Sequence, residues 1–221
     1  MHSTVEKLNL IKKEINEIVN KKQLKISPQI IVVTKTFPME KITSLLNFGH
    51  NHFGENKIQE AEKKWSELKN KNNLYLHMVG KVQSNKAKKA VKVFDFIHSL
   101  DNKKLALKLN ESEIELNKKV KYFIQVNIAN ETQKSGINLN EINEFYTYCT
   151  KELSLNIVGL MCLPPANIDP DTFFKLLKNE GEKLKIKELS MGMSGDYKVA
   201  LINGSTYLRL GSKIMGERKI I

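Results

Sequence analysis

The sequence predicts one domain over residues 1–221, a (β/α)8 barrel with an additional helix before its first strand. Eight short apolar segments of strand length alternate with segments of helical periodicity. The chain has 221 residues, 41% of them hydrophobic, which suits one large core. No linker or low-complexity tract divides it. An open doubly wound sheet is the alternative, and the number of expected strands favours the barrel.

The first half of the chain supplies four strands. Residues 3–20 carry apolar side chains three and four positions apart, which predicts the leading helix. The run IIVVTK over residues 30–35 is typical of a strand buried on both faces. Ser84 lies where a helix N-cap is expected. The further elements expected here are strands over 51–53, 74–79 and 94–99 and helices over 39–48, 55–68 and 84–91.

The second half continues the same alternation. Asp101 is expected to cap a helix that extends to residue 116. Pro164 and Pro165 prevent a helix directly after the sixth strand. The further elements expected here are strands over 120–127, 156–161, 188–191 and 205–210, helices over 139–151, 169–184 and 197–202, and a short C-terminal helix.

The net charge of +12 raises the possibility of nucleic acid as a partner. The chain has only two arginines, Arg209 and Arg218, whereas proteins that read bases usually need arginine forks. Scattered lysines on solvated helix faces, including the Lys/Glu runs at 62–71 and 178–187, are the simpler interpretation. We therefore expect no nucleic-acid partner.

No apolar run reaches the roughly eighteen residues that span a bilayer, and the acidic, amphipathic N-terminus is not a signal peptide. We therefore expect a cytoplasmic protein with no membrane partner. Cys149 and Cys162 fit no metal or redox spacing, and we assign them no role. His50 and His52 lack a third ligand, so we expect packing or surface residues and no metal.

Functional side chains are expected where the strands end, because barrels of this kind place their active sites at the carboxyl ends of the strands. Lys35 closes an apolar strand. Desolvation lowers the pKa of such an amine, and the neutral amine can attack an aldehyde. The alternative is that Lys35 lies just past the strand and points to water.

Two Gly/Ser loops follow the seventh and eighth strands, Ser194-Gly195 and Gly211-Ser212. Barrels commonly bind a phosphate there through backbone N–H groups, although ordinary turns use the same residues. A reactive lysine and a phosphate loop at one barrel mouth are what a pyridoxal phosphate site requires.

Arg209 lies within the last strand, between Leu208 and Leu210. A buried arginine needs an acceptor. In a pyridoxal phosphate site it could donate to the pyridine nitrogen, which would leave the ring unprotonated and weaken it as an electron sink. The alternative is an ion pair with a strand-end carboxylate such as Glu55. His77 and His98 are expected to be barrel residues with satisfied hydrogen bonds.

Seven segments together resemble the pyridoxal phosphate homeostasis protein family, over nearly the whole chain. None is specific alone, but their order and spacing are. They are VVTKTFP (32–38), HFGENKIQE (52–60), HMVGKVQSNK (77–86), IQVNIANETQKSG (124–136), GLMCLPP (159–165), LSMGMSGD (189–196) and GSTYLRLGSKIMGER (204–218).

The resemblance implies a fold-type III barrel similar to the N-terminal domain of alanine racemase, with pyridoxal 5'-phosphate held as a Schiff base on Lys35. It also implies Asn56 near the cofactor ring, Met191 and Met193 beside the cofactor, Arg209 on the pyridine nitrogen, and a phosphate cup of Ser194, Gly211 and Ser212. Lys134 matches a lysine discussed as a second cofactor contact. Leu76, Lys81 and Ser212 stand where the family often has Trp, Pro and Thr.

The same resemblance suggests a role. Alanine racemase pairs its barrel lysine with a tyrosine from a second domain, which we do not expect here. We therefore expect a monomeric, non-enzymatic carrier that holds the cofactor and releases it to apo-enzymes. The alternatives are a fold-type III racemase or decarboxylase, a cofactor-free aldolase that uses Lys35, and a nucleic-acid-binding protein.

Overall fold

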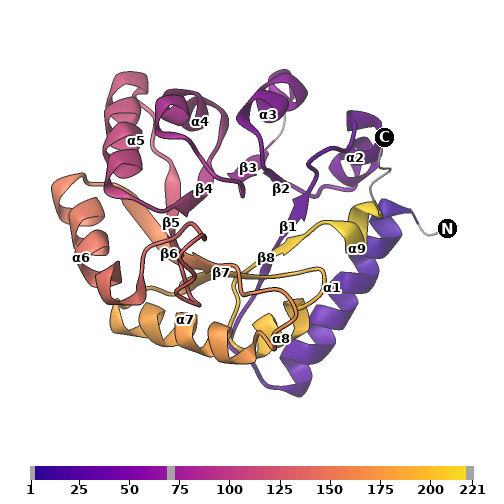
Figure 1. Ribbon diagram of the computed structural model, residues 1–221. Helices are drawn as coiled ribbons and strands as arrows, with labels where there is room; N and C mark the ends of the chain where they lie inside the picture. The colour runs from indigo at the N-terminus through magenta and orange to yellow at the C-terminus, as the bar shows by residue number, and fades with distance from the viewer. Residues whose placement is uncertain (1–2, 69–72, 218–221) are drawn as a thin grey trace.

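The computed structural model describes residues 3–68 and 73–217. Eight parallel strands close into a barrel in chain order, with β8 paired to β1 (Figure 1). This confirms the (β/α)8 fold and excludes the open sheet. The strands are β1 Gln29–Val33, β2 His52–Glu55, β3 Tyr75–Met78, β4 Phe96–Leu100, β5 Lys121–Val126, β6 Asn156–Cys162, β7 Glu188–Met193 and β8 Tyr207–Leu210.

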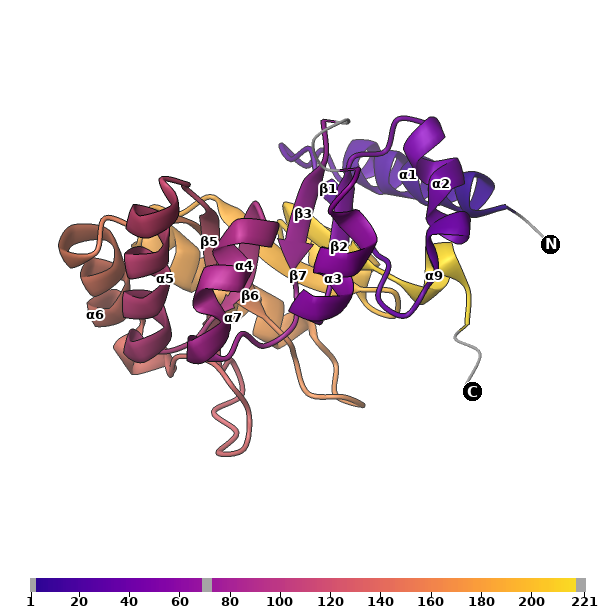
Figure 2. The ribbon, with the colours of Figure 1, turned by 90° about the horizontal axis from the view of Figure 1, so that it is seen from above.

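Helices surround the barrel, and α1 adds a layer against α2, α8 and α9 (Figure 1). The loops that follow β5 and β6 project from one side of the barrel (Figure 2). The α-helices are α1 Thr4–Lys21, α2 Met39–Asn47, α3 Ile58–Trp65, α4 Ala87–Val93, α5 Lys103–Leu116, α6 Ile142–Thr147, α7 Asp171–Lys183, α8 Tyr197–Ile202 and α9 Ser212–Met215. Short 3₁₀ helices η1 Ser84–Lys86 and η2 Leu139–Glu141 precede α4 and α6, and a short π-helix η3 Tyr148–Glu152 follows α6.

Helix starts are where the sequence-based prediction erred. Asn102 caps α5 by accepting from the backbone N–H of Leu105 at 2.8 Å, so the assignment of the cap to Asp101 is wrong. Ser84 opens a 3₁₀ turn and makes no side-chain cap. Glu55 belongs to β2 because its backbone continues the strand pairing with β3. Polar residues such as Asp, Asn and Ser occur both as helix N-caps and at strand ends. The sequence alone therefore does not show which of two neighbouring polar residues caps the helix.

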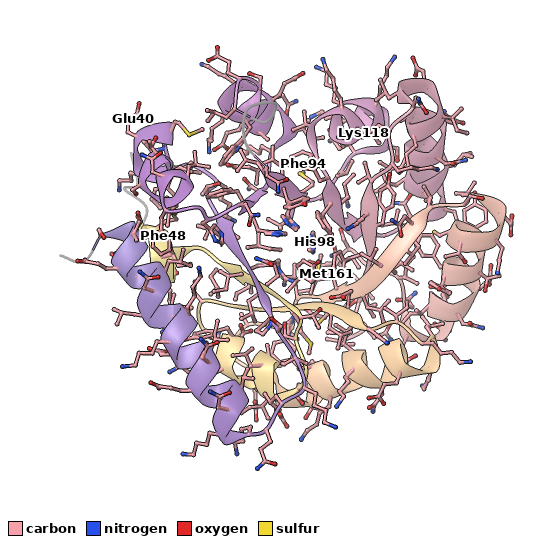
Figure 3. The ribbon with its side chains drawn as sticks, turned by 180° about the vertical axis from the view of Figure 1, so that it is seen from behind. Glu40, Phe48, Phe94, His98, Lys118 and Met161 are labelled. Carbon is pink, nitrogen blue, oxygen red and sulfur yellow. The ribbon has the colours of Figure 1, made fainter. Side chains whose placement is uncertain are left out.

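Side chains alternate between two cores. Leu208 and Leu210 of β8 face the helices and join the large outer core. Tyr207, the first residue of β8, faces inward against an inner cluster built around Phe96, Phe123 and Met161. His98 and Met161 lie at the centre of the barrel (Figure 3). Because strand side chains alternate with a period of two, this pattern also directs Arg209 into the barrel.

Within the described residues, no helix is long and apolar enough to cross a membrane. Over the same residues, no group of three or more His, Cys, Asp or Glu side chains is arranged to hold a metal ion.

Candidate functional site

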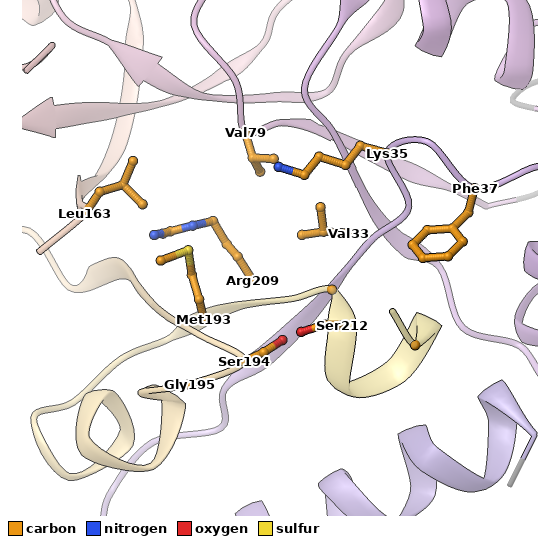
Figure 4. A pocket seen from close by; sticks show the side chains of 12 residues that line it. Val33, Lys35, Phe37, Val79, Leu163, Met193, Ser194, Gly195, Arg209 and Ser212 are labelled. Carbon is orange, nitrogen blue, oxygen red and sulfur yellow. The ribbon is translucent and has the colours of Figure 1, made fainter. Parts of the chain in front are cut away.

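A cavity of about 380 Å³ opens at the carboxyl ends of β1, β7 and β8. Its lining contains six of the eight residues that the sequence analysis places at the cofactor, namely Lys35, Met193, Ser194, Arg209, Gly211 and Ser212. In Figure 4 the side chains of Lys35 and Arg209 extend into the same space, and the hydroxyls of Ser194 and Ser212 lie together at one side of it. The lining residues are Val33, Lys35, Phe37, Val79, Leu163, Met193, Ser194, Gly195, Arg209, Gly211, Ser212 and Gly216.

Lys35 follows β1 directly and continues its alternation. Val33 and Lys35 line the cavity, while Thr34 between them is fully buried on the opposite face. The Thr34 hydroxyl donates to Glu55 Oε1 at 2.7 Å, which holds that face of the strand end against β2. The strand pattern therefore directs the Lys35 side chain into the cavity, as the first of the two sequence interpretations expected.

A network of charged groups outside the barrel braces this strand end. Lys64 Nζ donates to Glu55 Oε1 at 3.0 Å, to Glu60 Oε1 at 2.9 Å and to the backbone oxygen of Thr34 at 3.0 Å. Glu60 also accepts from the backbone N–H of Thr36 at 2.7 Å. Burial opposes ionisation of Glu60, but the hydrogen bonds from Lys64 and Thr36 outweigh it and lower the pKa of Glu60.

The brace supports an unusual backbone conformation. Thr36, directly after Lys35, has a φ of 67°, a left-handed conformation that costs a β-branched residue energy. The surrounding hydrogen bonds hold it there. This network was not predicted: the Lys/Glu run at 62–71 was interpreted as a solvated face, yet the side chain of Lys64 is only 10% exposed. Residues 69–71 of that run lie outside the described residues.

Arg209, in β8, extends its side chain to the wall of the cavity. Its Nη1 donates to the backbone oxygen and to Oγ of Ser190, both at 2.7 Å, and its Nη2 donates to the backbone oxygen of Cys162 at 3.0 Å. The alternative ion pair with Glu55 is wrong, because Glu55 faces outward to Lys64. A guanidinium carries five N–H groups, and among the described residues the other two meet no acceptor.

Burial shifts the ionisation of this region without discharging the arginine. Burial lowers the pKa of Arg209, but a guanidinium starts so high that it stays protonated. Burial also raises the pKa of the neighbouring Cys162 thiol to about 12. Cys162 is therefore a neutral, unreactive thiol, and Arg209 is a permanent donor at the floor of the cavity.

The two Gly/Ser loops meet at one side of the cavity. Ser194 Oγ accepts from the backbone N–H of Lys213 at 3.3 Å and so links the loop after β7 to the loop after β8. A Cβ atom at Gly211 would approach nothing closer than 3.7 Å, and one at Gly195 would meet nothing within 4 Å. Protein packing does not require glycine at either position, and the bare backbone is open to a ligand.

Two predicted contact residues lie elsewhere. Met191 is fully buried in the outer core, because Ser190 faces inward and its neighbour must face outward. Met193 lines the cavity instead and is 40% exposed. Asn56 borders a separate hollow of about 320 Å³ beside Lys81, and its buried Oδ1 has no hydrogen-bond partner among the described residues.

The remaining lining residues were not predicted from the sequence. Val33 and Val79 follow from strand alternation, which could have identified them, whereas Phe37 and Leu163 lie in loops. Lys134 does not line the cavity and pairs with Glu131 at 2.6 Å in the loop after β5.

Comparisons with known proteins place this chain in a family. Residues 7–219 match the family described as alanine racemase, N-terminal domain. A pyridoxal phosphate homeostasis protein of Synechocystis is 36% identical over 201 residues, covering 87% of this chain and 92% of the relative. One of Escherichia coli K12 is 32% identical over 200 residues, covering 86% of this chain and 85% of the relative.

Solved structures agree. The structure of PipY of Synechococcus elongatus with PLP bound superposes with a TM-score of 0.80 at 32% identity, covering 91% of this chain and all of PipY (100%). Clostridium difficile alanine racemase, 14% identical with a TM-score of 0.70, shares the fold over 96% of this chain and 57% of its own. The chain belongs to the pyridoxal phosphate homeostasis proteins, within the alanine racemase N-terminal domain family.

Proposed function

We propose that this chain binds pyridoxal 5'-phosphate in the cavity at the carboxyl ends of the strands, and that it acts in cofactor homeostasis as a carrier without substantial turnover. The observation that carries the proposal is that Lys35, Arg209 and both Gly/Ser loops line one cavity. The names of the relatives and the cofactor bound to PipY support the same assignment.

The residues present fit this cofactor part by part. The Lys35 amine suits the aldehyde, and the two unused N–H groups of Arg209 suit the ring nitrogen. Ser194 and the open backbone at Gly211 suit the phosphate. The side chains of Val33, Val79 and Leu163 offer apolar surface to the ring. A volume of about 380 Å³ is typical of a small-molecule site.

The chemistry of the site favours holding over turnover. Bound pyridoxal phosphate supplies an aldehyde carbon that a primary amine attacks reversibly, and a pyridine ring that withdraws electrons best when protonated. Arg209 holds a proton that it does not give up, so a ring nitrogen at its donors remains an acceptor. Lys35 and Arg209 are the ionisable side chains of the lining, so the described cavity offers no second base.

Binding and release test this proposal. Titration of the purified chain with pyridoxal phosphate should produce a visible absorption band, and the loaded chain should restore activity to an apo-enzyme that needs the cofactor. A protein that remains colourless would overturn the binding proposal and favour a cofactor-free aldolase. Turnover of amino acids at the rate of ordinary enzymes, about ten per second, would overturn the carrier proposal in favour of a racemase or decarboxylase.

A further inference from the structure

A row of hydrogen-bonded side chains crosses the inside of the barrel below the cavity. His52 Nδ1 lies 2.9 Å from His77 Nε2, and His77 Nδ1 lies 2.9 Å from His98 Nε2. His98 Nδ1 lies 2.8 Å from Oγ of Ser190, the same oxygen that accepts from Nη1 of Arg209 at 2.7 Å. We call Ser190, His98, His77 and His52 the histidine chain.

The histidine chain is buried and its rings are held in place. Three of its members, Ser190, His77 and His98, are fully buried, and His52 is 9% exposed. Each imidazole stacks on an aromatic ring of the next strand. The pairs are His52–Tyr75, His77–Phe96 and His98–Phe123, with ring centroids 4.8, 4.3 and 4.2 Å apart. Stacking fixes the ring planes, so each nitrogen has one partner direction.

The hydrogen-bonding capacity of the groups assigns a direction to the histidine chain. An arginine only donates, so Ser190 Oγ accepts from Arg209 and keeps its own hydrogen to donate. The acceptor within reach is His98 Nδ1. A neutral imidazole has one donor and one acceptor, so His98 carries its proton on Nε2 and donates to His77. His77 then donates from its own Nε2 to His52.

The opposite direction satisfies fewer groups. Ser190 would accept from both Arg209 and His98, and its hydroxyl hydrogen would meet no acceptor among the described residues. A protonated His77 would have to donate to both His52 and His98, so both neighbours would have to be acceptors toward it. Burial also lowers the pKa of His77 and of His98 well below the usual range, which keeps both rings neutral. The histidine chain therefore has three neutral rings, each protonated on Nε2.

We propose that the histidine chain acts as a positioning device for Arg209. Because the Ser190 hydrogen is committed to His98, a lone pair of Ser190 always faces Nη1. This holds the guanidinium in one orientation at the wall of the cavity. The inference rests on the proposed function only in naming the cofactor ring as the target of these donors.

The direction of the histidine chain can be measured in the cofactor-free protein. Two-bond ¹H–¹⁵N NMR correlation spectra of the protein, labelled with ¹⁵N at its histidines, distinguish the two neutral tautomers and the imidazolium. We expect His52, His77 and His98 to be neutral with the proton on Nε2 at neutral pH. A proton on Nδ1 of His98, or an imidazolium at His77 or His98, would overturn the assigned direction.

The link to Arg209 is tested with two substitutions. Ser190→Ala removes one hydroxyl and leaves the backbone oxygen that also accepts from Arg209. His50→Asn is the matched control, because His50 is also buried but bonds only the backbone oxygen of His52. The chain has two arginines, so separate Nη signals of Arg209, which appear when its rotation is blocked, are simple to assign.

We expect Ser190→Ala to broaden the Nη signals of Arg209, to increase the Nδ1-protonated form of His98, to shift the visible band and to weaken cofactor binding about tenfold. His50→Asn should leave all four unchanged. Unchanged Nη signals and unchanged binding in Ser190→Ala would contradict the positioning role. If the wild-type chain bound no cofactor, the proposed function would fail, while the Nη signals and tautomers would still decide this inference.

Discussion

The barrel interior has two levels that hold polar groups in opposite ways. At the carboxyl ends of the strands, Arg209 keeps two N–H groups that meet no acceptor among the described residues, and open glycine backbone adjoins it. Below, the groups from Ser190 to His52 are bonded in sequence and stacked on aromatic rings. Because the donors are unsatisfied at one level and paired at the other, we expect the ligand to bind at the mouth, above an ordered interior.

Removing the amine of Lys35 should have the largest effect, because it disables the mouth and leaves the lower level intact. In Lys35→Ala the mouth keeps its shape but has no amine for the aldehyde, so we expect loss of the visible band and cofactor binding at least about a hundredfold weaker. Spectrophotometric titration measures both. Lys134→Ala, at an exposed pair with Glu131, is the control and should bind normally. Equal losses in both variants would contradict the role given to Lys35.

Removing the arginine should affect both levels. Arg209→Met leaves the backbone oxygens of Ser190 and Cys162 without their donor in the barrel interior. We expect the free energy of unfolding to fall by about 3 kcal/mol, together with weaker cofactor binding. Denaturant unfolding of the cofactor-free protein measures the first effect. A variant as stable as the wild type would show that these contacts contribute little.

Lowering the pH should destabilise the protein through the buried histidines of the lower level. Burial lowers the pKa of His50 and of His52 to about 4, from an ordinary value of 6.5, and it lowers the pKa of His77 and His98 too. Between about pH 4 and pH 6.5, these histidines bind protons in the unfolded chain but not in the folded one. The free energy of unfolding should therefore fall as the pH drops through this range, by roughly 1.4 kcal/mol per pH unit for each proton of difference.

Denaturant unfolding at a series of pH values from neutral to about 5 checks this slope, above most carboxylate titrations. His50→Asn should reduce the slope, since it removes one of the buried imidazoles. Stability that does not change over this range would contradict neutral, buried histidines.

Weakening the network of Lys64, Glu55 and Glu60 outside β1, called the brace, should have the smallest effect on stability and binding. Glu60→Gln keeps the shape of the side chain but weakens its bonds to Lys64 and to the backbone of Thr36. We expect a loss of about 1 kcal/mol in stability and a few-fold weaker cofactor binding, because the turn after Lys35 becomes less fixed. Glu111→Gln, in an exposed pair with Lys108, is the control. An equal response of the two variants would remove the special role of the brace.

Strand alternation explains which parts of the site could be predicted. Lys35 follows an apolar run and Arg209 lies within one, and the strand period directs both side chains into the cavity, so the sequence indicated both. The same alternation, applied to β7, would have selected Met193 over Met191. The histidine chain could not be predicted in this way, because its contacts join different strands and depend on their register. Lys64 was misjudged because a charge run does not show which of its members faces the sheet.

Borohydride reduction of the chain with bound pyridoxal phosphate, followed by peptide mass spectrometry, tests the central claim most directly. Reduction makes the link between cofactor and protein permanent, so the modified residue reports which amine held the aldehyde. The account predicts a single major modification on Lys35. A modification on other lysines, with Lys35 unlabelled, would contradict it.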